Sequence, residues 1–154
     1  MQLTSPAFDD GGSIPERYTC DGDNASPPLL FWHVPADAKS LALIMEDPDV
    51  PHHVRKDGLW VHWVVWGLSP STPGIEEGAT PPGTVGVNTR GRNAYGGPCP
   101  PDGQHRYFFK LFALDTLPTL PITTSKKELL NAMDGHIIVA AELMGVYDRD
   151  THRE

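Results

Sequence analysis

An all-β fold is predicted for this chain of 154 residues, built as a two-sheet antiparallel sandwich with one or two short helices. Its apolar segments are short, rich in Val, Ile, Phe and Trp, and bounded by turn residues, which is typical of β-strands. Helical patterning is confined to one segment. This disfavours a parallel sheet, which needs a crossover helix after nearly every strand. The strands must therefore bury their apolar faces against each other.

Five apolar segments are the strand candidates. In chain order they are residues 29–34, 41–46, 60–68, 107–114 and 136–146. Several are almost continuously apolar, which indicates strands that are covered on both faces or lie centrally in a sheet. Three unusually long connections occur at residues 47–59, 69–84 and 91–104. Long ordered loops of this kind often carry function.

One segment is predicted to be helical, residues 125–133. Ser125 and Glu128 have the spacing of a capping box, which satisfies free backbone donors at the start of a helix. Three apolar residues then follow at helical spacing: Leu129, Leu130 and Met133. Gly135 stands where a helix commonly ends.

The length and charge of the chain limit its domain count and its partners. At 154 residues we expect a single domain over residues 1–154. Its 12 Lys and Arg against 20 Asp and Glu give a net charge of −8. No basic excess is therefore present to bind nucleic acid or an anionic membrane. We recognise no signal peptide and no apolar run of the roughly 18 residues that a membrane helix needs, and we expect a cytoplasmic location.

The sequence contains two cysteines, Cys20 and Cys99. Two cysteines without zinc spacing make neither a disulfide framework nor a metal motif. We expect free thiols, the default in a reducing cytosol. Whether the two meet in the fold is left open by the sequence, so a disulfide is the alternative.

The first candidate site residues follow the strand candidate at residues 41–46. Asp47 and Asp49 lie in the stretch Asp-Pro-Asp-Val-Pro, whose prolines restrict the backbone around them. A carboxylate held in this way has little entropy left to lose when it binds. An ordinary Asp-Pro turn is the alternative interpretation.

A histidine lies inside the strand candidate at residues 60–68. Because side chains alternate along a strand, we expect Trp60 and His62 to share one face, together with Val64 and Trp66. A histidine in so apolar a segment needs a hydrogen-bond partner, and Asp47 on a neighbouring strand would supply one. A core histidine that bonds to the backbone is the alternative.

The third group of candidates surrounds the start of the strand candidate at residues 107–114. Gly97 and Pro98 belong to a stiff loop in which glycine permits close approach of the backbone to a ligand. His105 and Tyr107 are two residues apart, so they share a face from which both can donate to an anionic oxygen. Arg106 points to the other face, and we expect it to pair with a loop carboxylate.

In their order and spacing these motifs resemble the phosphatidylethanolamine-binding protein family, also called Raf kinase inhibitor proteins, and most of all its bacterial and archaeal YbhB/YbcL-like branch. The main matching segments are D-P-D-V-P at 47–51, W-V-H-W at 60–63, G-P-C-P-P at 97–101 and G-Q-H-R-Y at 103–107. Y-T-C-D-G at 18–22 and S-P-P-L at 26–29 match as well. The resemblance runs from about residue 8 to residue 147, nearly the whole chain.

The resemblance implies a Greek-key β-sandwich with one small pocket for anions such as phosphate or phospholipid headgroups. By position, the family's pocket residues correspond to Asp47, Trp60, His62, Gly97, His105 and Tyr107, with Asp49 at the rim and Pro98 in the glycine loop. Pro48 matches a proline that follows a cis bond in the family. We also expect the chain to lack the C-terminal helix that borders the pocket in mammalian members.

The function hypothesis is a non-catalytic protein that binds a small anionic or phosphorylated ligand, without a cofactor or metal, and that regulates a kinase or another protein partner. Protonation of a histidine would add a charged donor, so we expect affinity for phosphate-like anions to rise as the pH falls. One alternative is a metal-dependent or Asp/His-based hydrolase that uses Asp47, Asp49 and His62. Another is a protease or kinase inhibitor that acts through a surface loop.

Homodimer formation is a further prediction. Trp60, Trp63 and Trp66 crowd into one segment, and the Pro-rich loop at residues 69–84 follows them. Exposed aromatic and proline surface often marks a contact site. We expect an interface near the rim of the pocket that partly replaces the missing helix. A monomer with these side chains buried is the alternative.

Overall fold

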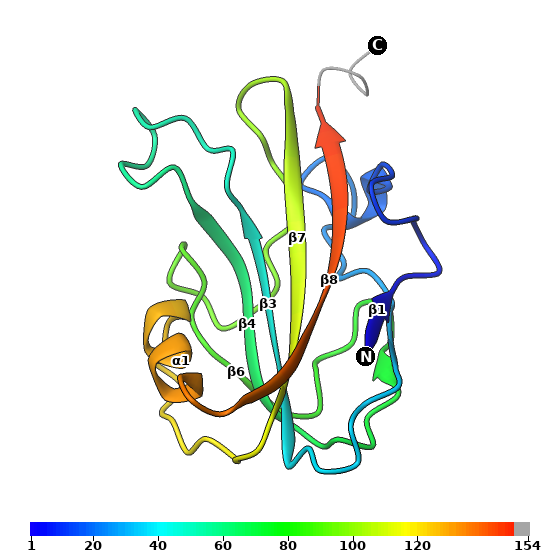
Figure 1. Ribbon diagram of the computed structural model, residues 1–154. Coiled ribbons are helices and arrows are strands. Elements are labelled where there is room, and N and C mark those ends of the chain that lie inside the picture. Colours follow the sequence, from blue (N-terminus) through cyan, green and yellow to red (C-terminus); the bar gives the residue numbers. More distant parts are fainter. Residues whose placement is uncertain (150–154) are drawn as a thin grey trace.

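Two antiparallel β-sheets and one α-helix make up the fold (Figure 1). The computed structural model describes residues 1–149. The smaller sheet has the strand order β1-β2-β5, formed by Gln2–Thr4, Leu29–Trp32 and Gly74–Ile75. The larger has the order β6-β4-β3-β7-β8, formed by Thr84–Val85, Trp60–Leu68, Ser40–Asp47, Gln104–Leu114 and Ile137–Asp148. The predicted all-β class is confirmed, and this strand order is compatible with a Greek key.

The larger sheet buries both of its faces, as its continuous apolar strands predicted. One face packs against the smaller sheet, and Leu43 and Met45 of β3 join Phe31 of β2 in that core. Alternate β3 residues, Ala42 and Ile44, point to the opposite face. There they meet the helix α1, Lys126–Met133, which in Figure 1 lies on the side of the larger sheet away from β1. All eight residues of β3 are therefore buried.

The helix forms where the sequence predicts it. Ser125 is the N-cap, and its hydroxyl donates to the carboxylate of Glu128 over 3.1 Å instead of capping a backbone donor. Leu129 and Met133 are fully buried, whereas Leu130 is partly exposed on the outer side. Gly135 adopts a φ of +78°, the left-handed conformation that glycine tolerates after a helix.

Strict alternation in β4 is wrong, because the pairing of β3 with β4 contains a β-bulge. Met45 pairs with Trp63 and Glu46 pairs with Val61, so His62 is an extra residue between two register partners. Beyond it, Val64 and Trp66 belong to the core under the helix. A bulge can re-aim a side chain, and bulges are common beside functional sites. His62 therefore does not share a face with Val64 and Trp66.

Three smaller expectations from the sequence have different outcomes in the structure. Trp63 and Trp66 are almost completely buried, at 1% and 2% exposure, so they offer no surface for a dimer contact. Residues 1–149 contain no cis peptide bond, so the expected cis bond before Pro48 is wrong. The expected lack of a C-terminal helix concerns the segment after β8 and lies outside the described residues. No helix within residues 1–149 is both long and apolar enough to cross a membrane.

Candidate functional site

The candidate site lies at one end of the larger sheet, where the central strand β3 ends and its neighbours β4 and β7 begin. Asp47, the last residue of β3, pairs with Trp60, the first residue of β4. Its other neighbour β7 contributes His105 and Tyr107, which are both buried and share one face, as predicted from their spacing. In Figure 1 this is the upper end of the sheet, from which the loop at residues 48–59 extends and where the loop at residues 86–103 reaches β7. Antiparallel pairing thus gathers residues that are far apart in the sequence.

A pocket of about 570 Å³ opens at this end of the sheet. Five of the predicted site residues line it: Asp47, Trp60, His62, Gly97 and Tyr107. The predicted residues Asp49, Pro98 and His105 are not among its lining residues. A second hollow of about 360 Å³ lies between the N-terminal strand and β8. The larger pocket is the better candidate, because only its lining includes buried polar atoms without partners.

Those atoms are Nε2 of His62 and the hydroxyl oxygen of Tyr107, neither of which has a hydrogen-bond partner within residues 1–149. His62 is 5% exposed and Tyr107 is 0% exposed. Their rings meet edge to face, with centroids 5.3 Å apart. Buried polar atoms nearly always have a partner, and leaving one unpaired costs roughly 1–3 kcal/mol. Two such atoms in one pocket indicate a place for a ligand.

The hydrogen bonding of His62 determines its tautomer. Its Nδ1 lies 2.6 Å from the carbonyl oxygen of Gly96. A carbonyl only accepts, so Nδ1 carries the proton and donates. Burial, helped by the charges of Arg90 and His105, lowers the pKa of His62 to about 4. The ring is therefore neutral near pH 7, and Nε2 is a bare acceptor.

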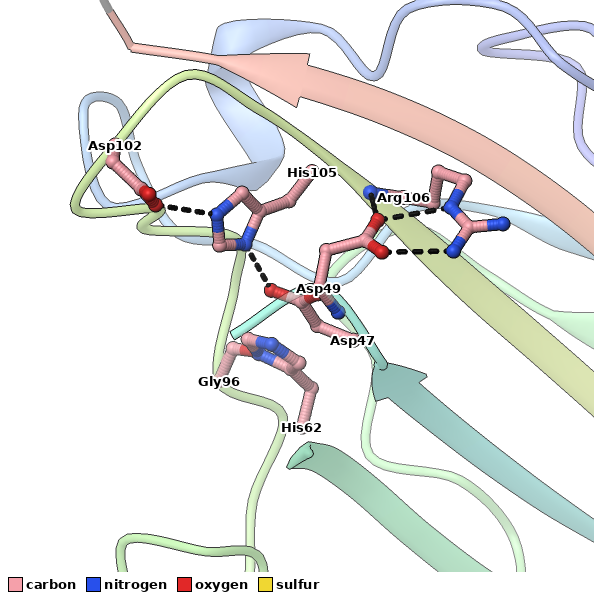
Figure 2. A network of polar contacts seen from close by, with 7 residues as sticks. All are labelled: Asp47, Asp49, His62, Gly96, Asp102, His105 and Arg106. Atoms are coloured by element: carbon pink, nitrogen blue, oxygen red, sulfur yellow. Dashed lines mark hydrogen bonds and ion pairs between the residues drawn. The ribbon is translucent and has the colours of Figure 1, made fainter. Parts of the chain in front are cut away.

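His105 lies between two carboxylates, and its pKa shifts in the opposite direction to that of His62 (Figure 2). Its Nδ1 lies 2.6 Å from Oδ2 of Asp47, and its Nε2 lies 2.8 Å from Oδ1 of Asp102. Burial alone would lower the pKa of His105, but the hydrogen bonds and charges of these two carboxylates outweigh it and raise the pKa. Both ring nitrogens are therefore occupied, and His105 has no donor left for a ligand. It holds Asp47 in place.

Asp47 is also engaged on its second oxygen. The amide of Asp49 donates to Oδ1 of Asp47 over 2.7 Å. Burial raises the pKa of the Asp47 carboxyl, whereas the hydrogen bonds from His105 and from the Asp49 amide oppose this effect. The partner predicted for Asp47 was His62, but the residue that bonds to it is His105. His62 instead has the backbone partner that the alternative interpretation described.

Asp49 and Arg106, neither of which lines the pocket, form a bidentate ion pair (Figure 2). Nε of Arg106 donates to Oδ2 of Asp49 over 2.9 Å, and a terminal nitrogen donates to Oδ1 over 2.8 Å. The amide of Arg106 also donates to Oδ2. The expected pairing of Arg106 with a loop carboxylate is confirmed, and it ties the loop after β3 to the start of β7.

The expectation of free thiols is wrong, because Cys20 and Cys99 form a disulfide, with Cα atoms 5.4 Å apart. Both cysteines line the pocket. Neighbouring contacts join the same two segments: the amide of Cys20 donates to the Pro98 carbonyl, and the amide of Gly97 donates to Oδ1 of Asn24. A β-carbon at Gly97 would collide with the backbone of the N-terminal segment. The close approach that glycine permits here is therefore between two loops.

Comparison with known proteins agrees with this architecture. The family model for phosphatidylethanolamine-binding protein matches residues 4–148. This chain belongs to the phosphatidylethanolamine-binding protein family. A UPF0098 protein of Chlamydia trachomatis is 54% identical over 150 residues, which are 97% of this chain and 100% of the relative. A UPF0098 protein of Methanothermobacter thermautotrophicus is 50% identical over 155 residues, 97% of this chain and 99% of the relative.

Solved structures extend the similarity to the whole fold of this family member. A homolog of phosphatidylethanolamine-binding protein from Chlamydia trachomatis superposes with a TM-score of 0.94 at 54% identity, covering 96% of each chain. YbcL of Escherichia coli, described as a new member of the mammalian family, superposes with a TM-score of 0.86 at 29% identity. This alignment covers 96% of the present chain and 97% of YbcL.

Sequence reasoning missed a polar loop at the mouth of the pocket. Asn88, Arg90 and Arg92 all line the pocket. Asn88 is buried, and its Oδ1 accepts from the amides of Arg90 and Arg92 over 2.9 and 3.1 Å. Its Nδ2 donates to the Ala94 carbonyl over 2.9 Å. The sequence signal that could have revealed this loop is Arg90-Gly91-Arg92, two positive charges close together in an acidic chain. Asp102, the second partner of His105, was also missed.

The described residues contain no metal-binding cluster. Within residues 1–149 no group of three or more His, Cys, Asp or Glu side chains could hold a metal ion. The carboxylates of Asp47 and Asp49 accept from His105 and Arg106, respectively. Among the residues that line the pocket, His62 and Tyr107 carry unpartnered atoms, and Arg90 and Arg92 are exposed.

Proposed function

We propose that the pocket binds a small phosphate-like anion as a recognition site, without catalysing a reaction. The observation that carries this proposal is the pair of unpartnered buried atoms, Nε2 of His62 and the hydroxyl of Tyr107. Burial, together with the nearby charge of Asp47, raises the pKa of Tyr107, so its hydroxyl keeps its proton and donates to an anionic oxygen. A ligand oxygen at this place would satisfy both atoms.

Local positive charge at the mouth supports an anion. Arg90 and Arg92 are exposed beside the pocket of a chain whose net charge is −8. Guanidinium groups suit phosphate because their planar fork donates two parallel hydrogen bonds. Since Asn88 fixes the backbone of both arginines, the loop is already shaped for binding. The attraction is local, because the chain as a whole repels anions.

The size and walls of the pocket indicate that the anion is part of a larger molecule. About 570 Å³ lies in the usual range of roughly 300–1,000 Å³ for small-molecule sites. Val50, Trp60 and Pro101 add apolar wall. A phosphorylated small molecule or a phospholipid headgroup fits this description. Asp49, Pro98 and His105 would act indirectly by holding the wall.

Titration calorimetry with methyl phosphate, at low ionic strength, tests the proposal. Tyr107→Phe removes one hydroxyl and keeps the ring, and we expect it to weaken binding about tenfold, the loss of one hydrogen bond to a charged group. Tyr18→Phe is the matched control. Its hydroxyl bonds to Glu77 outside the pocket lining, so affinity should stay unchanged. Absence of binding to the native chain would refute the proposal.

The same samples separate binding from hydrolysis. Incubation of the native chain with p-nitrophenyl phosphate should release no nitrophenol above the uncatalysed rate. Turnover that His62→Ala abolishes would instead support the hydrolase alternative. Regulation of a kinase or protease, a homodimer and a cytoplasmic location stay predictions. The disulfide weighs against the last, because disulfides are uncommon in reducing compartments.

A further inference from the structure

We propose that the pocket recognises the anion through a proton that the ligand still carries, and therefore selects phosphomonoesters over phosphodiesters and sulfates. This inference rests on the proposed function and adds the chemical class of the ligand. The pocket presents acceptors as well as a donor at its buried end. A fully deprotonated oxyanion can satisfy the donor but not the acceptors.

The first acceptor is Nε2 of His62. Its orientation follows from geometry, because Nδ1 is committed to the Gly96 carbonyl at 2.6 Å. This Nε2 is buried and has no partner within the described chain, and His62 lines the pocket. An oxyanion without a proton would place its own lone pair against this nitrogen. A P–O–H group would donate to it.

The second acceptor is the carboxylate of Asp47, which lines the same pocket. Each of its oxygens accepts one hydrogen bond from within the chain, from His105 and from the Asp49 amide. A carboxylate oxygen has a second lone pair, so Asp47 still accepts from a ligand and repels a ligand without a proton. Tyr107 supplies the donor for an unprotonated oxygen of the ligand.

Other charged or titratable groups face His62 from the surrounding elements. They are Asp47 on β3, His105 and Tyr107 on β7, and Arg90, Arg92 and Tyr95 on the loop at residues 86–103. The arginines hold the net negative charge of the ligand at the mouth. Both ring nitrogens of His105 are occupied by aspartates, so it does not replace the missing donor.

Phosphomonoesters match this arrangement because their second ionisation lies near pH 6. The monoanion carries one P–O–H for His62 and unprotonated oxygens for Tyr107 and the arginines. A phosphodiester or a sulfate ester has the same charge of −1 but no proton to donate. The structure thus favours a terminal phosphate over the bridging phosphate of a phospholipid.

Three probes of equal charge test this selection at pH 5.5: methyl phosphate, dimethyl phosphate and methyl sulfate. By titration calorimetry with the native chain we expect methyl phosphate to bind at least about tenfold more tightly than either other probe, because a buried acceptor left unpaired is costly. Equal affinity for all three would overturn the inference and leave the anion site intact. Absence of binding by all three would refute the proposed function as well.

A pH series then locates the proton. Affinity for methyl phosphate should fall about tenfold per pH unit above the ligand's own ionisation near pH 6, whereas affinity for methyl sulfate should stay constant. If both affinities rose together on acidification, the titrating group would belong to the protein, and the inference would be wrong. In His62→Gln the amide can present a donor instead of an acceptor, so the preference for methyl phosphate should shrink to less than about threefold. The probe comparisons on the native chain decide the question even if this variant does not fold.

Discussion

Two adjacent carboxylates on opposite faces of the larger sheet have very different hydrogen-bond surroundings. Glu46 and Asp47 are neighbours on β3, and both are buried. Glu46, on the helix side, accepts from Lys110 over 2.9 Å and from Lys126 at the start of α1. Asp47, at the pocket end, bonds to His105 and lies beside the unpartnered His62 and Tyr107. The carboxylate of Glu46 is paired with two lysines, whereas the pocket beside Asp47 keeps polar atoms without a hydrogen-bond partner.

The difference follows from how each region is built. On the helix side, Glu46 meets residues of a regular strand and a regular helix, whose spacing brings two ammonium groups to one carboxylate. The pocket is built from loops that are distant in sequence and held by a disulfide, a bidentate ion pair and a buried asparagine. Such a frame can keep polar atoms unpaired, at a cost that the rest of the fold must offset. An unpaired group in a rigid frame is a mark of a binding site.

The largest expected effect concerns the disulfide of the pocket. Replacement of both Cys20 and Cys99 by serine removes a link between residues 79 apart. By the loop-entropy relation, the free energy of unfolding should fall by about 4.5 kcal/mol. Urea denaturation monitored by tryptophan fluorescence measures this loss. The native chain treated with a dithiol reductant should match the double variant, and an unchanged midpoint in both would show that the other loop contacts suffice.

The next effect concerns the helix side. Burial would raise the pKa of Glu46, but the hydrogen bonds and charges of Lys126 and Lys110 outweigh it, and the pKa is lowered. Glu46→Gln leaves both ammonium groups without their counter-charge and should cost about 2 kcal/mol, since the lysines are partly exposed. Because the folded pKa is lowered, this stabilisation is present above the unfolded value of 4.5 and is lost as the pH falls through the folded value.

Two controls sharpen the Glu46 result. Glu142→Gln makes the same chemical change at an exposed position of β8 and should shift stability by less than about 0.5 kcal/mol. Affinity of Glu46→Gln for methyl phosphate should equal that of the native chain, because Glu46 does not line the pocket. Weaker binding in this variant would mean that the two faces are energetically coupled and not independent.

The sequence predicted the elements well and the pocket in part. The long strands were recognisable because continuous apolar runs are required when both faces of a sheet are covered, as in β3 and β4. The strands β1, β5 and β6 were missed because two or three residues carry no periodicity. The bulge at His62 was missed because it depends on the pairing register, which a single strand does not encode.

Charge states at the site could not be predicted from residue types. His62 and His105 look alike in sequence, but one bonds to a carbonyl and the other lies between two carboxylates. The disulfide depended on a contact between loops 79 residues apart, which a count of cysteines does not reveal. Motif order identified the family, whereas the roles of Asn88, Arg90 and Arg92 needed the folded loop.

The smallest expected effect distinguishes the two histidines within the pocket. NMR titration of the imidazole resonances should give His62 a pKa of about 4 and His105 a pKa above the unperturbed 6.5. Because the folded pKa of His105 is raised, its stabilisation is fully present below pH 6.5 and is lost as the pH rises through the folded value. Asp102→Asn should therefore lower the pKa of His105 and reduce stability mainly at acidic pH.

The size of that last effect follows from exposure. The side chain of Asp102 is 65% exposed, so solvent screens its interaction with His105, and the loss should stay below about 1 kcal/mol. Asp115→Asn is the matched control. It removes the carboxylate that pairs with the exposed His136 on the opposite edge of the fold, and it should leave the titration of His105 unchanged. If His62 and His105 titrated together in the native chain, the assignment of one ring as a bare acceptor and the other as a charged support would be wrong. The proton-based selection of the ligand would then lose its structural basis.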